Sequence, residues 1–213
     1  MKYKAILFDM DGTLLDTLTD MADAVNHILS VHGWPLRTTE EVRAFVGNGA
    51  RRLMERAVPP EVTGGDFEAV LTEYRDWYQA HNCVATAPYP GIPALLAALA
   101  KAGIKTAVVS NKPDATTKTL AARFFPGLPA FGQRDDVPPK PAPDLVFRAL
   151  ETLGVDAADA IYVGDSEVDV ATARNAGLPL AAVSWGFRGR RALAEAGAAV
   201  IVDTAAELLE VLQ

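Results

Sequence analysis

Lys4-Ala5-Ile6-Leu7-Phe8, followed at once by Asp9-Met10-Asp11-Gly12-Thr13, is the stretch that decides the fold of this chain. Its first half is a short apolar run, which is typical of a strand buried on both faces of a parallel sheet. Its second half places two acids at the carboxyl end of that strand, where open α/β folds carry their chemistry. Asp9 and Asp11 are two positions apart, so their side chains project to the same side of an extended segment. Neighbouring carboxylates repel each other unless a cation or a shared proton relieves them, so the pair indicates a divalent metal site.

Length, composition and charge narrow the class of protein. The chain has 213 residues, 50% of them hydrophobic, which is enough for one large domain or for a core with a modest insert. Its 20 Lys and Arg residues against 27 Asp and Glu residues give a formal net charge of -7, which disfavours nucleic-acid and anionic-membrane binding. Cys83 is the single cysteine, and no apolar run approaches the roughly 20 residues of a membrane span. We expect a cytoplasmic protein without nucleic-acid or membrane partners; its oligomeric state stays open.

Residues 16–86 show apolar residues at helical spacing and no strand pattern. The spacing predicts helices over residues 16–31, 49–58 and 66–80, and a further helix that begins near Thr38. Because a strand is predicted on either side of this region, we expect it to form a helical cap. The predicted domains are therefore a core of residues 1–15 and 87–213 and an inserted cap of residues 16–86.

From residue 87 onward, predicted strands alternate with predicted helices. Such alternation is typical of an α/β protein with a mostly parallel, doubly wound sheet. The predicted strands span residues 104–109, 130–131, 160–163, 180–183 and 199–202, and the predicted helices span residues 93–102, 113–125, 145–153, 170–176, a stretch near 191, and 205–212. The predicted fold class is thus α/β, with a doubly wound sheet and an inserted helical cap.

Polar side chains follow three of the predicted strands. Asp9 and Asp11 end the first strand, Ser110 follows the strand at 104–109, and Asp165 with Asp169 follows the strand at 160–163. The carboxyl ends of parallel strands share one edge of a sheet, so we expect these residues to surround one crevice. Carboxylates without matching histidines favour a hard cation such as Mg²⁺, and the three histidines all lie in the predicted cap.

Taken in order, these clusters resemble the motifs of haloacid dehalogenase-type (HAD) phosphatases. Singly, each has a plainer explanation. Asp9 and Asp11 could simply end a strand as turn residues, Ser110, Asp165 or Asp169 could cap a helix, and Lys140 could be a solvated loop charge. Their joint occurrence favours a site. The resemblance covers residues 4–183 and implies a Rossmann-like core. The matching stretches are Asp9-Met10-Asp11-Gly12-Thr13, Val108-Val109-Ser110-Asn111, Lys140 before Pro141, and Gly164-Asp165-Ser166-Glu167-Val168-Asp169.

The resemblance implies a catalytic role for each matching position. Asp9 would be the nucleophile, and Asp11 would act as general acid and then as general base. Ser110 would hydrogen-bond a phosphoryl oxygen, and Lys140 would offset the charge that develops on the phosphoryl group. Gly12, Thr13 and Asn111, which flank these positions, are assigned to substrate binding.

The resemblance also implies how Mg²⁺ is held. The ligands would be Asp9, the backbone carbonyl of Asp11, and Asp165. Asp169 also belongs to the metal site and is expected to support the ligands more than to touch the ion. Glu167 is a weaker candidate.

The loop Gly47-Asn48-Gly49, with Arg51 and Arg52 just beyond it, is predicted to face the substrate. It begins like a dinucleotide-binding loop, but it lacks the final glycine and follows a helix rather than a strand, so we reject a nucleotide-cofactor role. Its amides and arginines suit an anionic ligand. Solvent-exposed arginines are the alternative. With Leu53 and Arg56-Ala57, the loop resembles the cap of phosphoglycolate phosphatases.

The sequence thus predicts a Mg²⁺-dependent phosphomonoesterase that acts on a small phosphorylated metabolite through an aspartyl-phosphate, with 2-phosphoglycolate as the best single candidate. One alternative is a β-phosphoglucomutase-like sugar phosphomutase, which would return the phosphoryl group to the substrate. Another is a noncatalytic Mg²⁺-binding module that accepts a phosphoryl group at Asp9. The acid at Asp11 and the predicted cap argue against the noncatalytic module.

Overall fold

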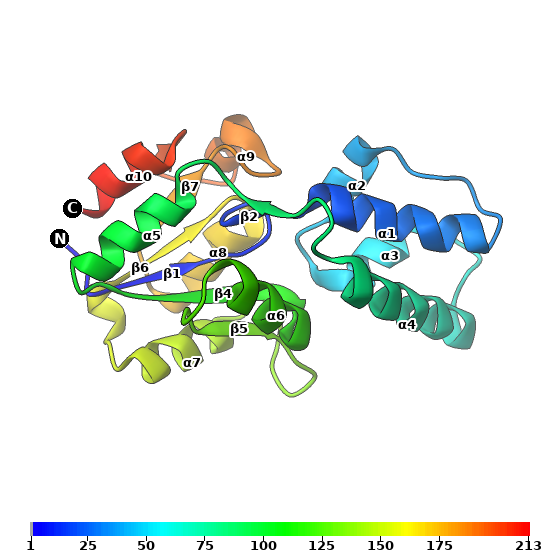
Figure 1. Cartoon of the computed structure of the whole chain (residues 1–213), viewed down its shortest axis with the longest axis horizontal. Coiled ribbons are helices and arrows are strands. Elements are labelled where there is room, and N and C mark those ends of the chain that lie inside the picture. The colour runs from blue at the N-terminus through cyan, green and yellow to red at the C-terminus, as the bar shows by residue number, and fades with distance from the viewer. Residues whose placement is uncertain (1) are drawn as a thin grey trace.

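The structure, a computed structural model, describes residues 2–213 and has a parallel sheet at the core of its larger lobe (Figure 1). The strands of this sheet are β1 (Ala5–Phe8), β4 (Lys105–Pro113), β5 (Ala130–Gln133), β6 (Ala160–Gly164), β7 (Leu180–Val183) and β8 (Ile201–Val202). Their spatial order is β5-β4-β1-β6-β7-β8, and every neighbouring pair is parallel. The predicted fold class, α/β with a doubly wound, mostly parallel sheet, is confirmed.

Strand β1 lies in the middle of the sheet, between β4 and β6. Its side chains alternate between two apolar clusters: Ile6 and Phe8 belong to one, Ala5 and Leu7 to the other. This burial on both faces explains the unbroken apolar run in the sequence. The chain builds the sheet outward from β1 in one direction with β4 and β5, and then in the other with β6 to β8. The order therefore reverses at β1, and ligands of open α/β sheets bind at the carboxyl ends beside such a point.

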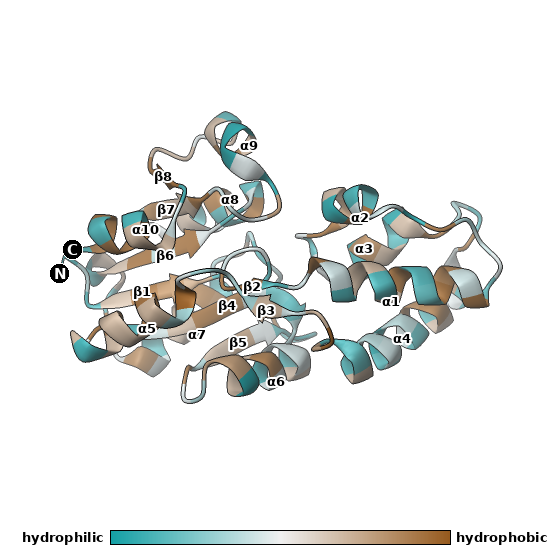
Figure 2. Cartoon of the chain, turned by 45° about the horizontal axis from the view of Figure 1, so that its top comes forward, coloured by the Kyte–Doolittle hydropathy of each residue, from teal (hydrophilic) through white to brown (hydrophobic). Residues whose placement is uncertain are grey.

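Helices cover both faces of the sheet. Figure 2 shows apolar strands at the centre and polar residues on the outer sides of the helices. Helices α5 (Ile92–Lys101), α6 (Asp114–Phe124) and α10 (Ala205–Leu212) share the apolar cluster of Ile6 and Phe8, whereas α7 (Asp144–Leu153) and α8 (Glu167–Ala176) share that of Ala5 and Leu7. A 3-10 turn, η1 (Ala157–Asp159), precedes β6, and α9 (Gly189–Glu195) lies between β7 and β8.

The remaining helices form a group at one end of the sheet (Figure 1). They are α1 (Leu18–Val31), α2 (Thr39–Phe45), α3 (Gly49–Ala57) and α4 (Gly64–His81), and they pack around an apolar cluster of their own. Two short strands, β2 (Leu15–Asp16) and β3 (Ala87–Pro88), pair antiparallel where the chain enters and leaves the group. The division into domains at residues 15/16 and 86/87 stays a prediction. Within residues 2–213, no helix is both long and apolar enough to cross a lipid bilayer.

Two elements near the strand ends differ from the predicted ones. β4 continues to Pro113 instead of ending at Val109, because its polar residues are buried with hydrogen-bond partners rather than exposed in a loop. α8 begins at Glu167 instead of at residue 170, because Ser166 caps it: the Ser166 hydroxyl accepts from the Asp169 N–H, and the Asp169 carboxylate accepts from the Ser166 N–H. The β2–β3 pair was not predicted, since two-residue strands carry no periodic signal.

Candidate active site

The carboxyl ends of β1, β4 and β6 face the helical group α1–α4 across a cavity of about 330 Å³. The sheet contributes acids and polar groups to its wall, and the helices contribute mostly apolar groups. The structure thus brings the polar strand ends to one crevice. The wall includes, from the sheet side, Asp9, Asp11, Ser110, Asn111, Lys112 and Asp165, and, from the helical side, Gly47, Gly49, Leu53, Tyr74 and Tyr78.

Asp9 sits where β1 ends. Its N–H donates to the carbonyl of Val163 (2.9 Å), which continues the pairing of β1 with β6. Its carboxylate accepts hydrogen bonds from the Met10 N–H (2.7 Å) and pairs with the ammonium of Lys140 (3.0 Å). Burial raises the pKa of Asp9 to about 7, against the opposing effect of Lys140 and with a further rise from Asp169 and Asp11. An oxygen of this group faces the cavity, where it can act as a nucleophile.

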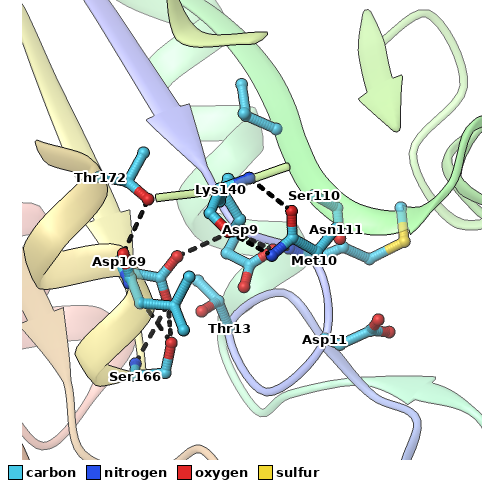
Figure 3. A network of polar contacts seen from close by, with 12 residues as sticks. Asp9, Met10, Asp11, Thr13, Ser110, Asn111, Lys140, Ser166, Asp169 and Thr172 are labelled. Carbon is cyan, nitrogen blue, oxygen red and sulfur yellow. Dashed lines mark hydrogen bonds and ion pairs between the residues drawn. The ribbon is translucent and has the colours of Figure 1, made fainter. Parts of the chain in front are cut away.

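Lys140 connects Asp9 to a buried polar network (Figure 3). The residue is 3% exposed, and its Nζ donates to Asp169 (2.8 Å) and to the Tyr162 hydroxyl (3.0 Å) as well as pairing with Asp9. Burial alone would lower the pKa of the Lys140 ammonium, but the carboxylates of Asp169 and Asp9 raise it well above its usual range. Lys140 is therefore a permanent positive charge beside Asp9.

Asn111 holds the backbone of Lys140 in place. Its Oδ1 accepts from the Lys140 N–H (2.7 Å), and its Nδ2 donates to the Lys140 carbonyl (3.0 Å) and to the Gly47 carbonyl (3.2 Å). The side chain that the sequence assigned to the substrate is thus occupied by partners from the protein. Its position joins the end of β4 to both the Lys140 loop and the helical group.

Asp9, Asp165 and Asp169 form a buried acidic group whose carboxylate oxygens lie within 4.8 Å of one another. Burial and the neighbouring carboxylates of Asp169 and Asp9 raise the pKa of Asp165 well above its usual range. Such crowding of like charges is relieved by a divalent cation, and a set of carboxylate oxygens without nitrogen or sulfur ligands fits Mg²⁺. Asp169 is already engaged by Lys140 and by Ser166 at the start of α8. It is therefore better placed to support the ligands than to join them.

The carboxylate of Asp11 stands apart from this acidic group. Figure 3 shows its side chain pointing away from Asp9 and Lys140. It accepts a hydrogen bond from the Thr17 hydroxyl (2.8 Å) and pairs with the ammonium of Lys112 through both oxygens (3.0 and 3.1 Å). This leaves only the backbone carbonyl of Asp11 for the predicted metal contact.

Gly12 and Thr13 shape the acidic group from the loop after β1. Gly12 has a φ of 84°, and a Cβ built on it would clash with the carboxylate of Asp165, so any other residue there would strain the backbone and displace Asp165. The buried Thr13 hydroxyl donates to the other oxygen of Asp165 (3.0 Å). Both residues were assigned to the substrate from sequence, and the structure places them against Asp165. Ser110, by contrast, lines the cavity.

The predicted cap loop reaches the cavity only in part. Gly47 and Gly49 line it, whereas the side chain of Asn48 accepts a hydrogen bond from Arg56 (3.1 Å). Arg51 forms a bidentate ion pair with Glu68 (2.8 and 2.7 Å), and Arg52 pairs with Glu55 (2.7 Å). Neither Arg51 nor Arg52 borders the cavity. The positions of Arg51 and Arg52 match the alternative of solvent-exposed arginines.

Glu167, the weaker candidate for the metal site, lies outside the acidic group and pairs with Arg188 (3.0 Å).

A segment after β7, Phe187 with Arg188, joins the two sides of the cavity. The Phe187 ring packs into the apolar cluster of α1–α4, and its N–H donates to Asp165 (2.8 Å). Arg188 donates to the backbone carbonyls of Arg43 (2.8 Å) and Val46 at the end of α2. The segment therefore ties the helical group to the acidic group.

Sequence reasoning missed several residues of the cavity wall. Lys112 offered a signal, as a lysine that directly follows Ser110 and Asn111. Tyr74 and Tyr78 gave none, because aromatic residues at helical spacing indicate a core face. The residues missed include Lys112, Tyr74, Arg75, Tyr78, Gln79, Thr116, Phe187 and Arg188.

Several known proteins with similar sequences or structures are named phosphatases. Residues 6–183 match the family described as haloacid dehalogenase-like hydrolase. An N-acetylmuramic acid 6-phosphate phosphatase of Pseudomonas aeruginosa is 36% identical over 100% of this chain and 96% of its own. A plasmid phosphoglycolate phosphatase of Cupriavidus necator is 37% identical over 94% of this chain and 89% of its own. A solved structure from Lactobacillus delbrueckii subsp. bulgaricus, provisionally assigned as a phosphoglycolate phosphatase, has a TM-score of 0.94 and 38% identity, and covers 100% of this chain and 99% of that one.

Proposed function

Because the chain belongs to the haloacid dehalogenase-like hydrolase family and is a phosphatase, we propose that it hydrolyses small phosphate monoesters through a phosphorylated Asp9. The observation that carries the proposal is the setting of Asp9. Its carboxylate borders the cavity, pairs with the buried ammonium of Lys140 at 3.0 Å and adjoins an acidic group suited to a divalent cation.

The proposed reaction has two steps that use Asp9 and Asp11. In the first, an Asp9 oxygen attacks phosphorus, the bond from phosphorus to the ester oxygen breaks, and Asp11 gives that oxygen a proton. In the second, Asp11 takes a proton from water as the water attacks the acyl phosphate, which releases inorganic phosphate and restores the Asp9 carboxylate. Lys140 and the Ser110 hydroxyl bind phosphoryl oxygens in both steps. These roles fit a site in which Asp9 and Asp11 border one cavity and point apart.

Asp9, Asp165 and the backbone carbonyl of Asp11 would hold Mg²⁺, with Asp169 in support. When bound, the ion supplies positive charge that offsets the negative charge of the phosphoryl oxygens. The fit rests on the carboxylate oxygens of Asp9, Asp165 and Asp169, which lie within 4.8 Å of one another, and on the raised pKa values of Asp9 and Asp165.

Mg²⁺ should raise the melting temperature by about 5 to 10 °C when it is present at about 100 times its dissociation constant near pH 8. Because folding raises the pKa of Asp9 to about 7, the metal-free protein is more stable below that pH and loses this stability as the pH rises through it. Protons also compete with the ion below that pH, so the Mg²⁺-induced shift should be smaller near pH 5.5. Thermal unfolding with and without Mg²⁺ measures both effects.

The controls are two matched variants. Asp165→Asn should lose most of the Mg²⁺-induced shift, whereas Asp135→Asn, at an exposed position remote from the cavity wall, should keep it. An undiminished shift in Asp165→Asn would show that the ion binds elsewhere.

Two substrates are proposed, and both are phosphate esters of carboxylic acids. The first is 2-phosphoglycolate, supported by relatives named phosphoglycolate phosphatase, such as that of Cupriavidus necator. The second is N-acetylmuramic acid 6-phosphate, supported by the relative from Pseudomonas aeruginosa. One observation favours this larger ester: the apolar wall of Leu53, Tyr74 and Phe187 offers contacts that a two-carbon acid cannot use.

A panel of esters with Mg²⁺ tests the proposed function. The kcat/KM for one of the two acid esters should exceed that for glucose 6-phosphate by about tenfold or more. The reason is that a buried cation in the site favours an ester with a carboxylate, which glucose 6-phosphate lacks. Release of inorganic phosphate is the measurement. Equal values across the panel would contradict the proposed substrates, and interconversion of hexose 1- and 6-phosphates without phosphate release would establish the mutase alternative.

The proposed setting is the cytoplasm, and the proposed partners are small phosphate esters alone. Cys83 is a free thiol, which suits a reducing compartment. The formal net charge of -7 opposes attraction to nucleic acid.

A further inference from the structure

Lys112 places a buried ammonium group on the cavity wall, and the reaction proposed above gives it no task. The residue is 5% exposed, and its Nζ lies 3.0 and 3.1 Å from the two carboxylate oxygens of Asp11. It also lies 4.6 Å from the centroid of the Tyr78 ring, in a cation–π contact. Lys112 and Lys140 are the two buried lysines among residues 2–213. Removing an ammonium group from water costs free energy. A buried lysine on the cavity wall without a role in the proposed reaction therefore needs an explanation.

The position of Lys112 next to Asp11 determines which part of a substrate it meets. If Asp11 protonates the ester oxygen, that oxygen lies within hydrogen-bond reach of the Asp11 carboxylate. In 2-phosphoglycolate the carboxylate is bonded to the carbon that carries the ester oxygen. It must therefore lie close to Asp11, where Lys112 is the neighbouring cation.

The other cations near the cavity are less suited to this carboxylate. Lys140 pairs with Asp9 and Asp169 on the phosphoryl side. Arg188 is bound to the carbonyls of Arg43 and Val46 and to Glu167. Arg75 borders the cavity but is exposed. Lys112 pairs with Asp11, and it is thus the buried cation on the side of the cavity where the ester oxygen would lie.

A buried hydroxyl on the same wall has no partner among residues 2–213. It is that of Tyr78, which is 4% exposed and whose ring lies beneath the Lys112 ammonium. Burial raises the pKa of Tyr78 well above its usual range, with a further rise from Asp11, so the hydroxyl keeps its proton as a donor. A buried donor without an acceptor is costly, and a bound carboxylate would supply the acceptor.

We propose that Lys112 is the specificity-determining residue for phosphate esters of 2-hydroxy acids, and that it binds the carboxylate carried on the carbon next to the ester oxygen, with the Tyr78 hydroxyl as a second donor. The proposal rests on the proposed function of the same site. It assigns the carboxylate to the sheet side of the cavity, and not to Arg51 or Arg52 in the helical group. The Lys112 ammonium pairs with the Asp11 carboxylate. A bound substrate carboxylate would share that ammonium with Asp11.

The test compares 2-phosphoglycolate with ethyl phosphate, in which a methyl group replaces the carboxylate. In Lys112→Met, the ratio of kcat/KM for 2-phosphoglycolate to that for ethyl phosphate should fall by about 10- to 150-fold, the range for loss of a hydrogen bond to a charged group. Lys112→Arg should keep part of the ratio, and Tyr78→Phe should lower it independently. Lys118→Met, on the exposed face of α6 and outside the cavity, should leave the ratio and both rates unchanged.

An equal fall for both substrates in Lys112→Met would overturn the proposal, because it would show that Lys112 acts only through Asp11. A wild-type enzyme with no preference for 2-phosphoglycolate over ethyl phosphate would also overturn it, while leaving the phosphatase function intact.

A binding measurement separates the two proposals. Calorimetry with the turnover-blocked Asp9→Asn variant gives the affinity for 2-phosphoglycolate, and adding Lys112→Met should weaken it by about tenfold or more. Unchanged affinity in the double variant overturns the role of Lys112. Carboxylate-dependent binding that requires Lys112, in a wild-type enzyme that hydrolyses neither of these esters nor N-acetylmuramic acid 6-phosphate, supports that role and refutes the proposed function.

Discussion

Replacing Asp9 with asparagine should lower kcat for phosphate-ester hydrolysis by about four to six orders of magnitude, the loss seen when a catalytic nucleophile is removed. An amide is a poor nucleophile and a weaker ligand for Mg²⁺, so the substitution should slow the attack on phosphorus and weaken Mg²⁺ binding. Asp9 follows the last residue of β1, and its carboxylate pairs with Lys140. Steady-state kinetics measure the loss, and mass spectrometry after acid quench should find a phosphorylated Asp9 peptide in the wild type alone.

The structure makes the variant interpretable. Asparagine removes one of three crowded carboxylates, so the metal-free variant should fold at least as well as the wild type, as circular dichroism can show. Asp135→Asn is the matched control at an exposed position. Turnover within a hundredfold of the wild type would eliminate the aspartyl-phosphate route.

Replacing Lys140 with methionine should lower both activity and stability. Without the ammonium, no buried donor at this position stabilises the charge that develops on the phosphoryl group. The kcat should therefore fall by about 10²- to 10³-fold. The side chain of Asp169, which is 1% exposed, would also lose its ion pair, and a broken buried pair costs about 3 to 5 kcal/mol. For a chain of this size that corresponds to a fall in melting temperature of about 6 to 20 °C.

Thermal unfolding and kinetics of the same preparation separate the two effects. Lys118→Met, whose lysine is exposed and pairs with Asp114 on α6, should change neither. A normal melting temperature with lost activity would mean that Asp169 finds another partner and that Lys140 acts on the substrate alone. Full activity would contradict the role of Lys140 in phosphate binding.

The fold was predictable because it depends on patterns that neighbouring residues carry. The apolar run at residues 4–8 is continuous because β1 is buried on both faces, with Ile6 and Phe8 on one side and Ala5 and Leu7 on the other. The later alternation of strands and helices indicated a parallel sheet. Parallel strands bring their carboxyl ends to one edge, so the meeting of Asp9, Ser110 and Asp165 at one cavity followed from the order of the elements.

The partners of individual polar side chains were not predictable in the same way. Asn111 follows Ser110 at a strand end, which indicated substrate binding, yet its amide is occupied by the backbone of Lys140. Arg51 and Arg52 follow a glycine-rich loop, yet they pair with Glu68 and Glu55 on the surface of the helical group. A local pattern shows that a charge is present but does not show the direction of its side chain.

By itself, then, the sequence determined the fold class, the order of the motifs and the edge of the sheet at which they meet, because periodicity and strand order are local properties. Only the tertiary structure decided which charges face each other in the cavity. Lys112 meets the carboxylate of Asp11 although the two residues are 101 positions apart, and Tyr78 comes beneath its ammonium from the helical group. Such contacts depend on how α4 packs over the ends of β1 and β4, and hydrophobic periodicity contains no distance between elements that are remote in the chain.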